Sequence, residues 1–202
     1  LMVIFRSLPN TLKYVRCILI GIPLWFVVGI LITFSPEFGK ALKMPLLPSA
    51  AKAVMFAYIG LALGDFASGC LSQIFKSRKK VAAAFMVLNA VCMLVYLFNP
   101  APSLGVFYAT CLALGFASGY WAVFVTIAAE QFGTNIRSTV ATTVPNFVRG
   151  SVVPLTLSFQ ALKGGYGIIN GTLIVAVFCV WLAFFALAGL KETHGKDLDY
   201  VE

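Results

Sequence analysis

Two charged side chains, Asp65 and Arg149, lie inside long apolar segments of this chain. Each stands near the middle of its segment, about a dozen residues from the nearest basic loop, which places it about 15–20 Å deep in a bilayer at about 1.5 Å of rise per residue. Burying a charge at that depth costs at least about 2.5–3.5 kcal/mol. Such residues tend to border a water-filled cavity or to pair with each other. Together they indicate a path across a membrane.

The remaining reactive residue types do not support catalysis. The one histidine, His194, lies in a polar tail, and no nucleophile with a neighbouring base is present. A glycine-rich phosphate loop followed by Lys and Ser or Thr is missing, so an ATP-driven pump is unsupported. The five cysteines are odd in number and scattered over apolar segments, which argues against a disulfide framework or a metal cluster. We therefore expect no enzyme activity, no metal and no cofactor.

The composition is that of a membrane protein. Hydrophobic residues make up 60% of the chain, charged residues 11%, and the mean hydropathy is +0.95. Alternating apolar and polar positions are absent, which disfavours a membrane β-barrel. Six stretches are long enough to cross a bilayer as helices: Cys17–Phe34, Ala53–Phe75, Val81–Asn99, Leu104–Ala129, Ser138–Leu162 and Gly164–Leu190. We predict an all-α polytopic membrane protein with one six-helix domain over 1–202.

The net charge of +8 is concentrated on the side of the predicted bundle that holds both termini. Ten basic residues lie on that side: Arg6, Lys13, Arg16, Lys76, Arg78, Lys79, Lys80, Arg137, Lys191 and Lys196. Four lie on the other: Lys40, Lys43, Lys52 and Lys163. This bias predicts cytoplasmic termini and a cytoplasmic 76–80 loop in a bacterial inner membrane. Anionic lipid headgroups are a sufficient partner for the charge, so nucleic acid is not indicated.

The second and fifth predicted helices carry organised small and polar residues. On the second, small residues recur every four positions and suit close packing: Gly60, Gly64, Ser68 and Ser72. On the fifth, polar residues form a stripe: Thr142, Asn146, Arg149, Thr156 and Gln160. Pro145 and Pro154 bracket Arg149 and would loosen the backbone beside it. In each group of three predicted helices, the middle helix carries a charge and polar residues, whereas the two outer helices carry no charge. This pattern indicates two inverted three-helix repeats over about 14–99 and 104–190, an arrangement found in secondary transporters.

Six residues are candidates for a substrate or proton site: Asp65, Arg149, Asn146, Thr142, Trp121 and Trp25. Asp65 could carry a proton or contact substrate, or it could form a structural pair with Arg149. Arg149 could bind an anionic group of a substrate, or serve only in that pair. The two tryptophans could form aromatic walls or ordinary helix contacts, and Asn146 and Thr142 could line a cavity or bond between helices. These alternatives stay open on the sequence.

Three segments resemble signature loops of the major facilitator superfamily. The segment 69–80 is similar to its Gly-x-Leu-x-Asp-Arg-x-Gly-Arg-Arg loop, with Gln73 where the pattern has Asp. Glu130 and Arg137 match the Glu-x6-Arg signature of the sugar and metabolite porters. The tail 191–198 resembles their Pro-Glu-Thr-Lys-Gly-x-x-Leu motif, with Lys191 for Pro and His194 for Lys.

The resemblance covers nearly the whole chain and implies the C-terminal six-helix half of a secondary transporter. It implies alternating access, proton-coupled movement of a small polar metabolite or organic anion, and an N-terminal six-helix half as partner. Since the chain opens with Leu1, we expect it to belong to something longer. It also implies a cytoplasmic gate made by these residues: Glu130, Arg137, Arg78, Lys79 and Glu192. The alternatives are a polyspecific drug/H+ efflux half and a six-helix membrane scaffold that transports nothing.

Overall fold

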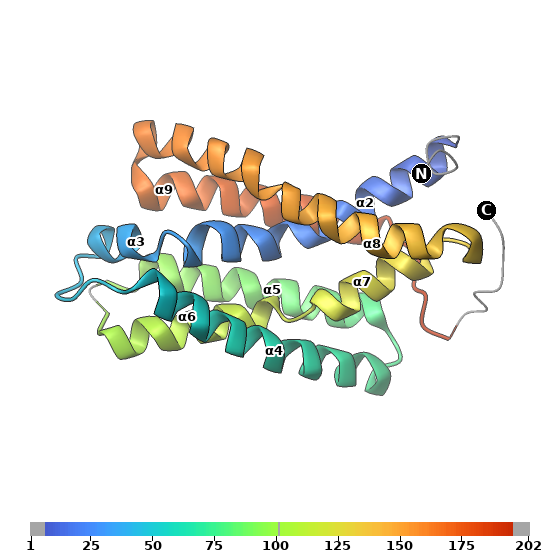
Figure 1. Ribbon diagram of the computed structural model, residues 1–202, viewed down its shortest axis with the longest axis horizontal. Helices are drawn as coiled ribbons and strands as arrows, with labels where there is room; N and C mark the ends of the chain where they lie inside the picture. The colour runs from blue at the N-terminus through green and yellow to red at the C-terminus, as the bar shows by residue number, and fades with distance from the viewer. Residues whose placement is uncertain (1–6, 101, 196–202) are drawn as a thin grey trace.

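The computed structural model describes residues 7–100 and 102–195, and the regular structure of these residues is entirely helical (Figure 1). In chain order the helices are α2 (Leu8–Phe26), the π-helix η1 (Val27–Ile32), α3 (Ser35–Ala41), α4 (Ala50–Ile74), α5 (Arg78–Phe98), α6 (Leu104–Ser118), α7 (Trp121–Glu130), α8 (Thr134–Gly150) and α9 (Val152–Ala188). Arg6 and the tail residues from Lys196 onward, which belong to the predicted charge bias and tail motif, lie outside the described residues.

Five helical stretches of the described chain are long and apolar enough to cross a membrane. The last, Thr134–Ala188, has 55 residues and holds two passes, because the chain reverses within α9 (Figure 1). The backbone is non-helical at Gly167, with φ 77° and ψ 168°. Such a positive φ costs glycine little. The reversal therefore lies at Gly167, slightly later than Lys163, where the predicted stretches Ser138–Leu162 and Gly164–Leu190 meet.

Helix boundaries differ from the predicted ones mainly at the starts. The first helix begins at Leu8 rather than Cys17, and it carries proline in its first turn, where the missing N–H would be unpaired in any case. The fifth begins at Thr134 rather than Ser138. The predicted single helix Leu104–Ala129 is divided into α6 and α7 at Gly119–Tyr120. A short helix, α3, follows the first pass, between two of the predicted stretches.

The small-residue stripe of α4 packs directly on α6, as predicted. Gly60, Gly64, Ser68 and Ser72 are all buried. A Cβ atom on Gly60 would lie 2.0 Å from the carbonyl oxygen of Leu112, and one on Gly115 would lie 1.9 Å from that of Ala57. The two backbones approach so closely that only a hydrogen atom fits between them at these positions.

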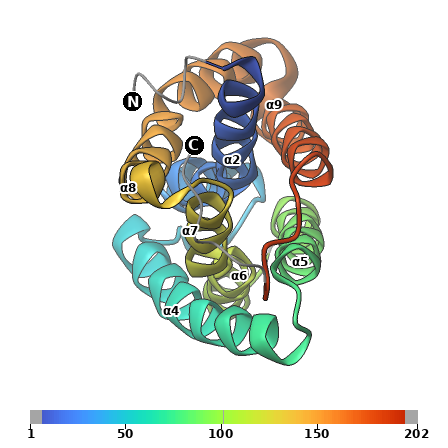
Figure 2. The ribbon, with the colours of Figure 1, turned by 90° about the vertical axis from the view of Figure 1, so that its right-hand side faces the viewer.

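The helices form two groups with α7 between them (Figure 2). One group contains α4, α5 and α6, and the other contains α2, α8 and α9. The start of α2, the α4–α5 turn and the end of α9 share one end of the bundle, whereas α3 and the reversal within α9 lie toward the opposite end (Figure 1). On the outside, large apolar side chains of α5 and of the second arm of α9 are exposed, among them Phe98, Val177 and Trp181. Such a surface suits contact with lipid.

Candidate functional site

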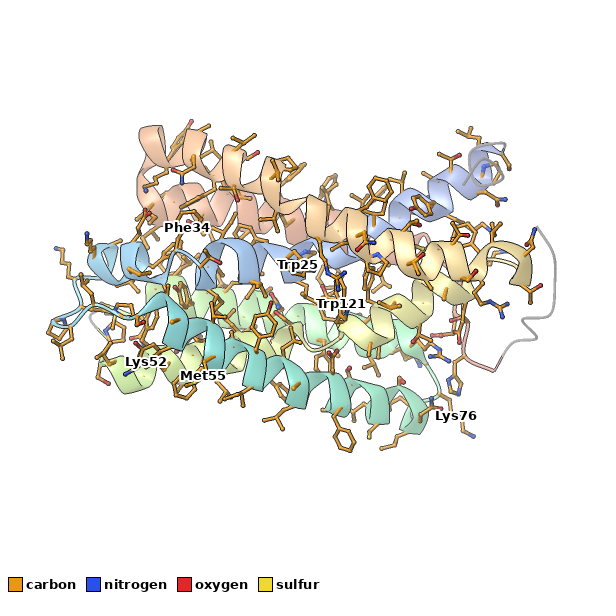
Figure 3. The ribbon with its side chains drawn as sticks, viewed as in Figure 1. Trp25, Phe34, Lys52, Met55, Lys76 and Trp121 are labelled. Atoms are coloured by element: carbon orange, nitrogen blue, oxygen red, sulfur yellow. The ribbon has the colours of Figure 1, made fainter. Side chains whose placement is uncertain are left out.

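Helices α2, α4, α7 and α8, together with the first turn of η1, line a partly open cavity of about 230 Å³. Its lining is mostly apolar and aromatic: Leu24, Trp25, Val28, Tyr58, Leu61, Trp121 and Arg149. Figure 3 shows Trp25 and Trp121 close together near the middle of the bundle's length. The tryptophan cavity, as we call it, therefore brings together three of the six predicted site residues.

Trp121 reaches this position because the helix is broken just before it. At the break, Gly119 lies against α4, and a Cβ atom there would be 2.3 Å from the carbonyl carbon of Gly64. The new helix α7 starts at Trp121. Its unpaired backbone N–H groups need an acceptor, and Asp65 on α4 supplies one by accepting from the N–H of Ala122 at 3.0 Å.

Two more interruptions lie beside the cavity. Helix α2 widens into the π-helix η1 at Val27, directly after Trp25 and Phe26. Helix α8 ends at Gly150 and α9 begins at Val152. These two segments touch, since a Cβ atom on Gly29 would lie 2.9 Å from the side chain of Val152. The predicted loosening beside Arg149 thus takes the form of a one-residue distortion at Ser151, where the backbone stays close to helical with φ −64° and ψ −17°.

Arg149 is exposed, at the rim of the tryptophan cavity, and its guanidinium faces aromatic rings. The guanidinium carbon lies 5.4 Å from the ring centroid of Trp121 and 5.9 Å from that of Trp25. The two indoles meet edge to face with centroids 6.1 Å apart. Arg149 Nη1 also donates to Oδ1 of Asn146 at 3.1 Å. Ring quadrupoles attract a cation at these distances.

Asp65 and Arg149 do not form an ion pair within the described chain. The carboxylate of Asp65 is directed to the start of α7, while Arg149 turns to Asn146 and the tryptophans. The direct pair, one of the alternatives that the sequence left open, is therefore not present in this conformation. Each charged side chain therefore has its own set of partners.

Thr142 lies outside the tryptophan cavity. It is exposed, and its hydroxyl donates to the carbonyl oxygens of Ser138 and Thr139 in its own helix. Sequence reasoning missed four lining residues. Leu24 and Val28 lie beside Trp25 in the first pass, and Tyr58 and Leu61 lie on α4. The spacing of Tyr58 and Leu61 from Asp65, seven and four positions, places them on its side of α4. That spacing was the available signal.

A charged cluster ties three segments together at the end of the bundle where α2 begins. Arg78 Nη2 lies 2.7 Å from Glu130 Oε1, joining the start of α5 to the end of α7. Glu192 accepts hydrogen bonds from the Ser77 hydroxyl and from the backbone N–H groups of Arg78 and Lys79. The ammonium group of Lys79 donates to the carbonyl oxygen of Leu190.

These contacts assemble four of the five predicted gate residues. The fifth, Arg137, donates from Nε to the carbonyl oxygen of Phe132 at 3.4 Å, in the turn between α7 and α8. Gln73 stands where the resembled loop has an acid, and its neutral amide cannot form an ion pair. The acid that pairs with Arg78 is Glu130. The acidic partner of the basic loop at this end of the bundle therefore comes from α7 and not from the loop itself.

The Glu192 carboxylate is held in its charged form. Burial raises its pKa, but the hydrogen bonds from Ser77, His194, Arg78 and Lys79 outweigh burial and lower the pKa to about 2. Hydrogen bonds to the ionised form favour that form. Glu192 thereby acts as an N-terminal cap for α5, supplied by a segment more than a hundred residues away in the sequence.

No protein-family model, curated protein or solved structure matches this chain.

Proposed function

We propose that this chain is a six-helix half of a secondary transporter of the major facilitator type, which moves a small polar metabolite or organic anion by alternating access. The observation that carries the proposal is the tryptophan cavity, where an arginine and two tryptophans meet beside three interrupted helices. Transporter sites lie at the midplane among discontinuous helices, since unwound backbone is tolerated only where it lines a cavity or is buried in protein.

The packing supports a duplicated three-helix unit. In the proposed division, α2, α4 and α5 form the first repeat, and α6–α7, α8 with the first arm of α9, and the second arm of α9 form the second. The middle helix of the first repeat packs on the first helix of the second, α4 on α6, and α8 packs in turn on α2. This reciprocal exchange is what a two-fold axis between inverted repeats requires.

In the proposed mechanism, this half rocks against an N-terminal six-helix half around the shared site. The charged cluster of Arg78, Glu130 and Glu192 closes one end of the bundle and breaks when the site opens there. The side chains of the Arg78–Glu130 pair are only 17% and 12% exposed. Contacts that exist in one state and not in the other bias the equilibrium between the two states.

Proton coupling would act through Asp65. Its carboxylate accepts from the first turn of α7, the helix that begins with Trp121. A proton on that oxygen removes the charge that attracts the N–H of Ala122. Protonation at Asp65 would thereby change how firmly α7, and with it one wall of the cavity, is held.

Water access to the cavity tests the proposal. We expect a cysteine at Leu61→Cys to react with a membrane-impermeant thiol reagent in sealed membranes, because the cavity opens to water. Val177→Cys, on the exposed apolar arm of α9, is the matched control and should stay unlabelled because it faces lipid. Both variants carry Cys70→Ala, since Cys70 is exposed.

Alternating access further predicts that Leu61→Cys reacts from each side of the membrane in turn. Adding a transported solute should shift the labelling rate from one side to the other. A Leu61→Cys variant that is as unreactive as Val177→Cys from both sides would overturn the proposal and favour a membrane scaffold.

A further inference from the structure

We infer that the tryptophan cavity binds a small monocarboxylate with an aromatic or branched apolar body. The inference rests on the proposed function, because it names the class of solute for the same site. Arg149 is the one charged residue among the described residues that line the cavity. A guanidinium offers five N–H donors in a planar fork, and a carboxylate fits that fork with both oxygens.

The positive charge of Arg149 lacks a counter-ion in the described part of the chain. Its hydrogen-bond acceptor is the neutral amide oxygen of Asn146. The nearest candidate acid on the cavity helices, Asp65, is engaged with the N–H of Ala122. A charge at this depth is costly without a partner of opposite sign. An anionic solute would supply that partner.

One anionic group on the solute is enough to neutralise Arg149. A second negative charge on the solute would have no cation to pair with. The two other cations of the same pass, Arg137 and Lys163, are already engaged: Arg137 donates to the carbonyl oxygen of Phe132, and Lys163 pairs with Glu37. The site is thus matched to a single carboxylate rather than to a dianion.

The walls match an apolar body. Trp25 and Trp121 present two indoles at 70° to each other, and the aliphatic lining comes from Leu24, Val28 and Leu61. Each hydroxyl group of a sugar needs a hydrogen-bond partner when it leaves water, at a cost of about 1–3 kcal/mol if none is found. With the Tyr58 hydroxyl, the indole N–H groups and Arg149 as its polar groups, the lining offers too few partners for a sugar.

One of those polar groups is itself unsatisfied. The indole Nε1 of Trp25 is buried and has no hydrogen-bond partner. Buried donors are nearly always paired in folded proteins, and an orphan indicates a missing acceptor. Because this atom is closed off from solvent in the present conformation, a carboxylate oxygen held by Arg149 could reach it only after the indole turns.

The volume of the cavity suits a solute of about one ring. At about 30 Å³ per water molecule, 230 Å³ corresponds to about eight waters. A carboxylate on a single aromatic ring, such as phenylacetate, has this size.

Equilibrium binding of radiolabelled phenylacetate to the purified protein tests the inference. We expect saturable binding below about 1 mM, the usual upper range for transported or converted small molecules, with no displacement by glucose or by the neutral phenylacetamide. Arg149→Gln should weaken binding by about thirtyfold or more, as for other truncated buried charge pairs. Arg149→Lys, which keeps the charge but loses the fork, should lie between the parent and Arg149→Gln.

Two matched controls separate the site from general effects on folding. Lys163→Gln removes a cation outside the cavity, and Trp181→Leu removes a tryptophan from the exposed arm of α9. Both should bind phenylacetate as the parent does, whereas Trp121→Leu should bind it weakly. Absence of binding up to about 10 mM, ten times that range, or equal displacement by phenylacetamide would overturn the inference.

The two proposals fail separately. If Leu61→Cys reacts with the aqueous reagent but phenylacetate does not bind, the solute class is wrong and the transporter proposal stands. If Leu61→Cys is unreactive from both sides, the transporter proposal fails, whatever phenylacetate does.

Discussion

The carboxylate of Glu192 accepts hydrogen bonds from the Ser77 hydroxyl and from two backbone N–H groups at the start of α5. Its pKa is about 2 in the folded protein, against an ordinary value of 4.5. Because the folded pKa is the lower one, the ionised carboxylate stabilises the fold above about pH 4.5. That contribution disappears as the pH falls toward 2.

Replacing Glu192 by Gln should therefore destabilise the protein in a pH-dependent way. At pH 7 we expect a loss of about 1 kcal/mol, typical of a removed helix cap. The difference from the parent should shrink below about pH 4.5 and vanish near pH 2, as measured by thermal unfolding in one detergent across that range. Lys191→Gln, at the exposed neighbouring position, is the control and should change little. A Glu192→Gln deficit that is constant with pH would contradict the assigned role.

The contact between α4 and α6 depends on glycines that have no room for a side chain. A Cβ atom on Gly64 would lie 2.2 Å from the carbonyl oxygen of Phe116, which is backbone and cannot rotate away. Gly69 lies five residues later on α4 and has no atom within 4 Å of its would-be Cβ. The two glycines therefore lie on the same helix but differ in the room available for a side chain.

We expect Gly64→Ala to lower the free energy of unfolding by about 1–3 kcal/mol, the usual cost of overpacking. Gly69→Ala should be neutral or stabilising by up to about 1 kcal/mol, because alanine has the higher helix propensity. Thermal unfolding of both variants under the same conditions gives the comparison. If the two melt alike, then the helices separate easily and the contact does not hold the bundle together.

The same elements explain what the sequence could and could not predict. The role of the small-residue stripe of α4 was predictable because small residues at every fourth position of a membrane helix usually serve close helix packing. The break between α6 and α7 was not predictable, because Gly119 and Tyr120 lie inside a continuous apolar stretch. It depends on the approach of Gly64 and on the cap from Asp65, both distant in sequence.

At the candidate site, residue types were predictable but partners were not. Arg149 and the tryptophans stood out as a charge and as aromatic residues inside apolar segments, and they do meet at one cavity. The suggested pairing of Asp65 with Arg149 assumed that two lone charges must neutralise each other. Asp65 instead accepts from a backbone N–H that the helix break exposes, which no spacing rule reveals.

At the scale of the whole molecule, charge distinguishes the two ends of the bundle. The end where α2 begins carries most of the described basic residues: Lys13, Arg16, Lys76, Arg78, Lys79, Lys80, Arg137 and Lys191. The opposite end carries fewer: Lys40, Lys43, Lys52 and Lys163. Figure 3 shows Lys76 and Lys52 near opposite ends of α4. Only one orientation puts the larger group on the cytoplasmic side.

Fusions to alkaline phosphatase, which is active only outside the cytoplasm, test this orientation. We expect low activity for a fusion after Lys76, in the basic turn between α4 and α5, and high activity for one after Met44, in the segment between α3 and α4. The two points flank a single 25-residue helix of about 37 Å, long enough to cross a hydrocarbon core of about 30 Å. Exchanging Lys76, Lys79 and Lys80 for Gln should raise activity at the first point, because the basic residues retain that turn inside. High activity after Lys76 and low activity after Met44 in the parent would reverse the orientation and place the charged cluster on the outer face.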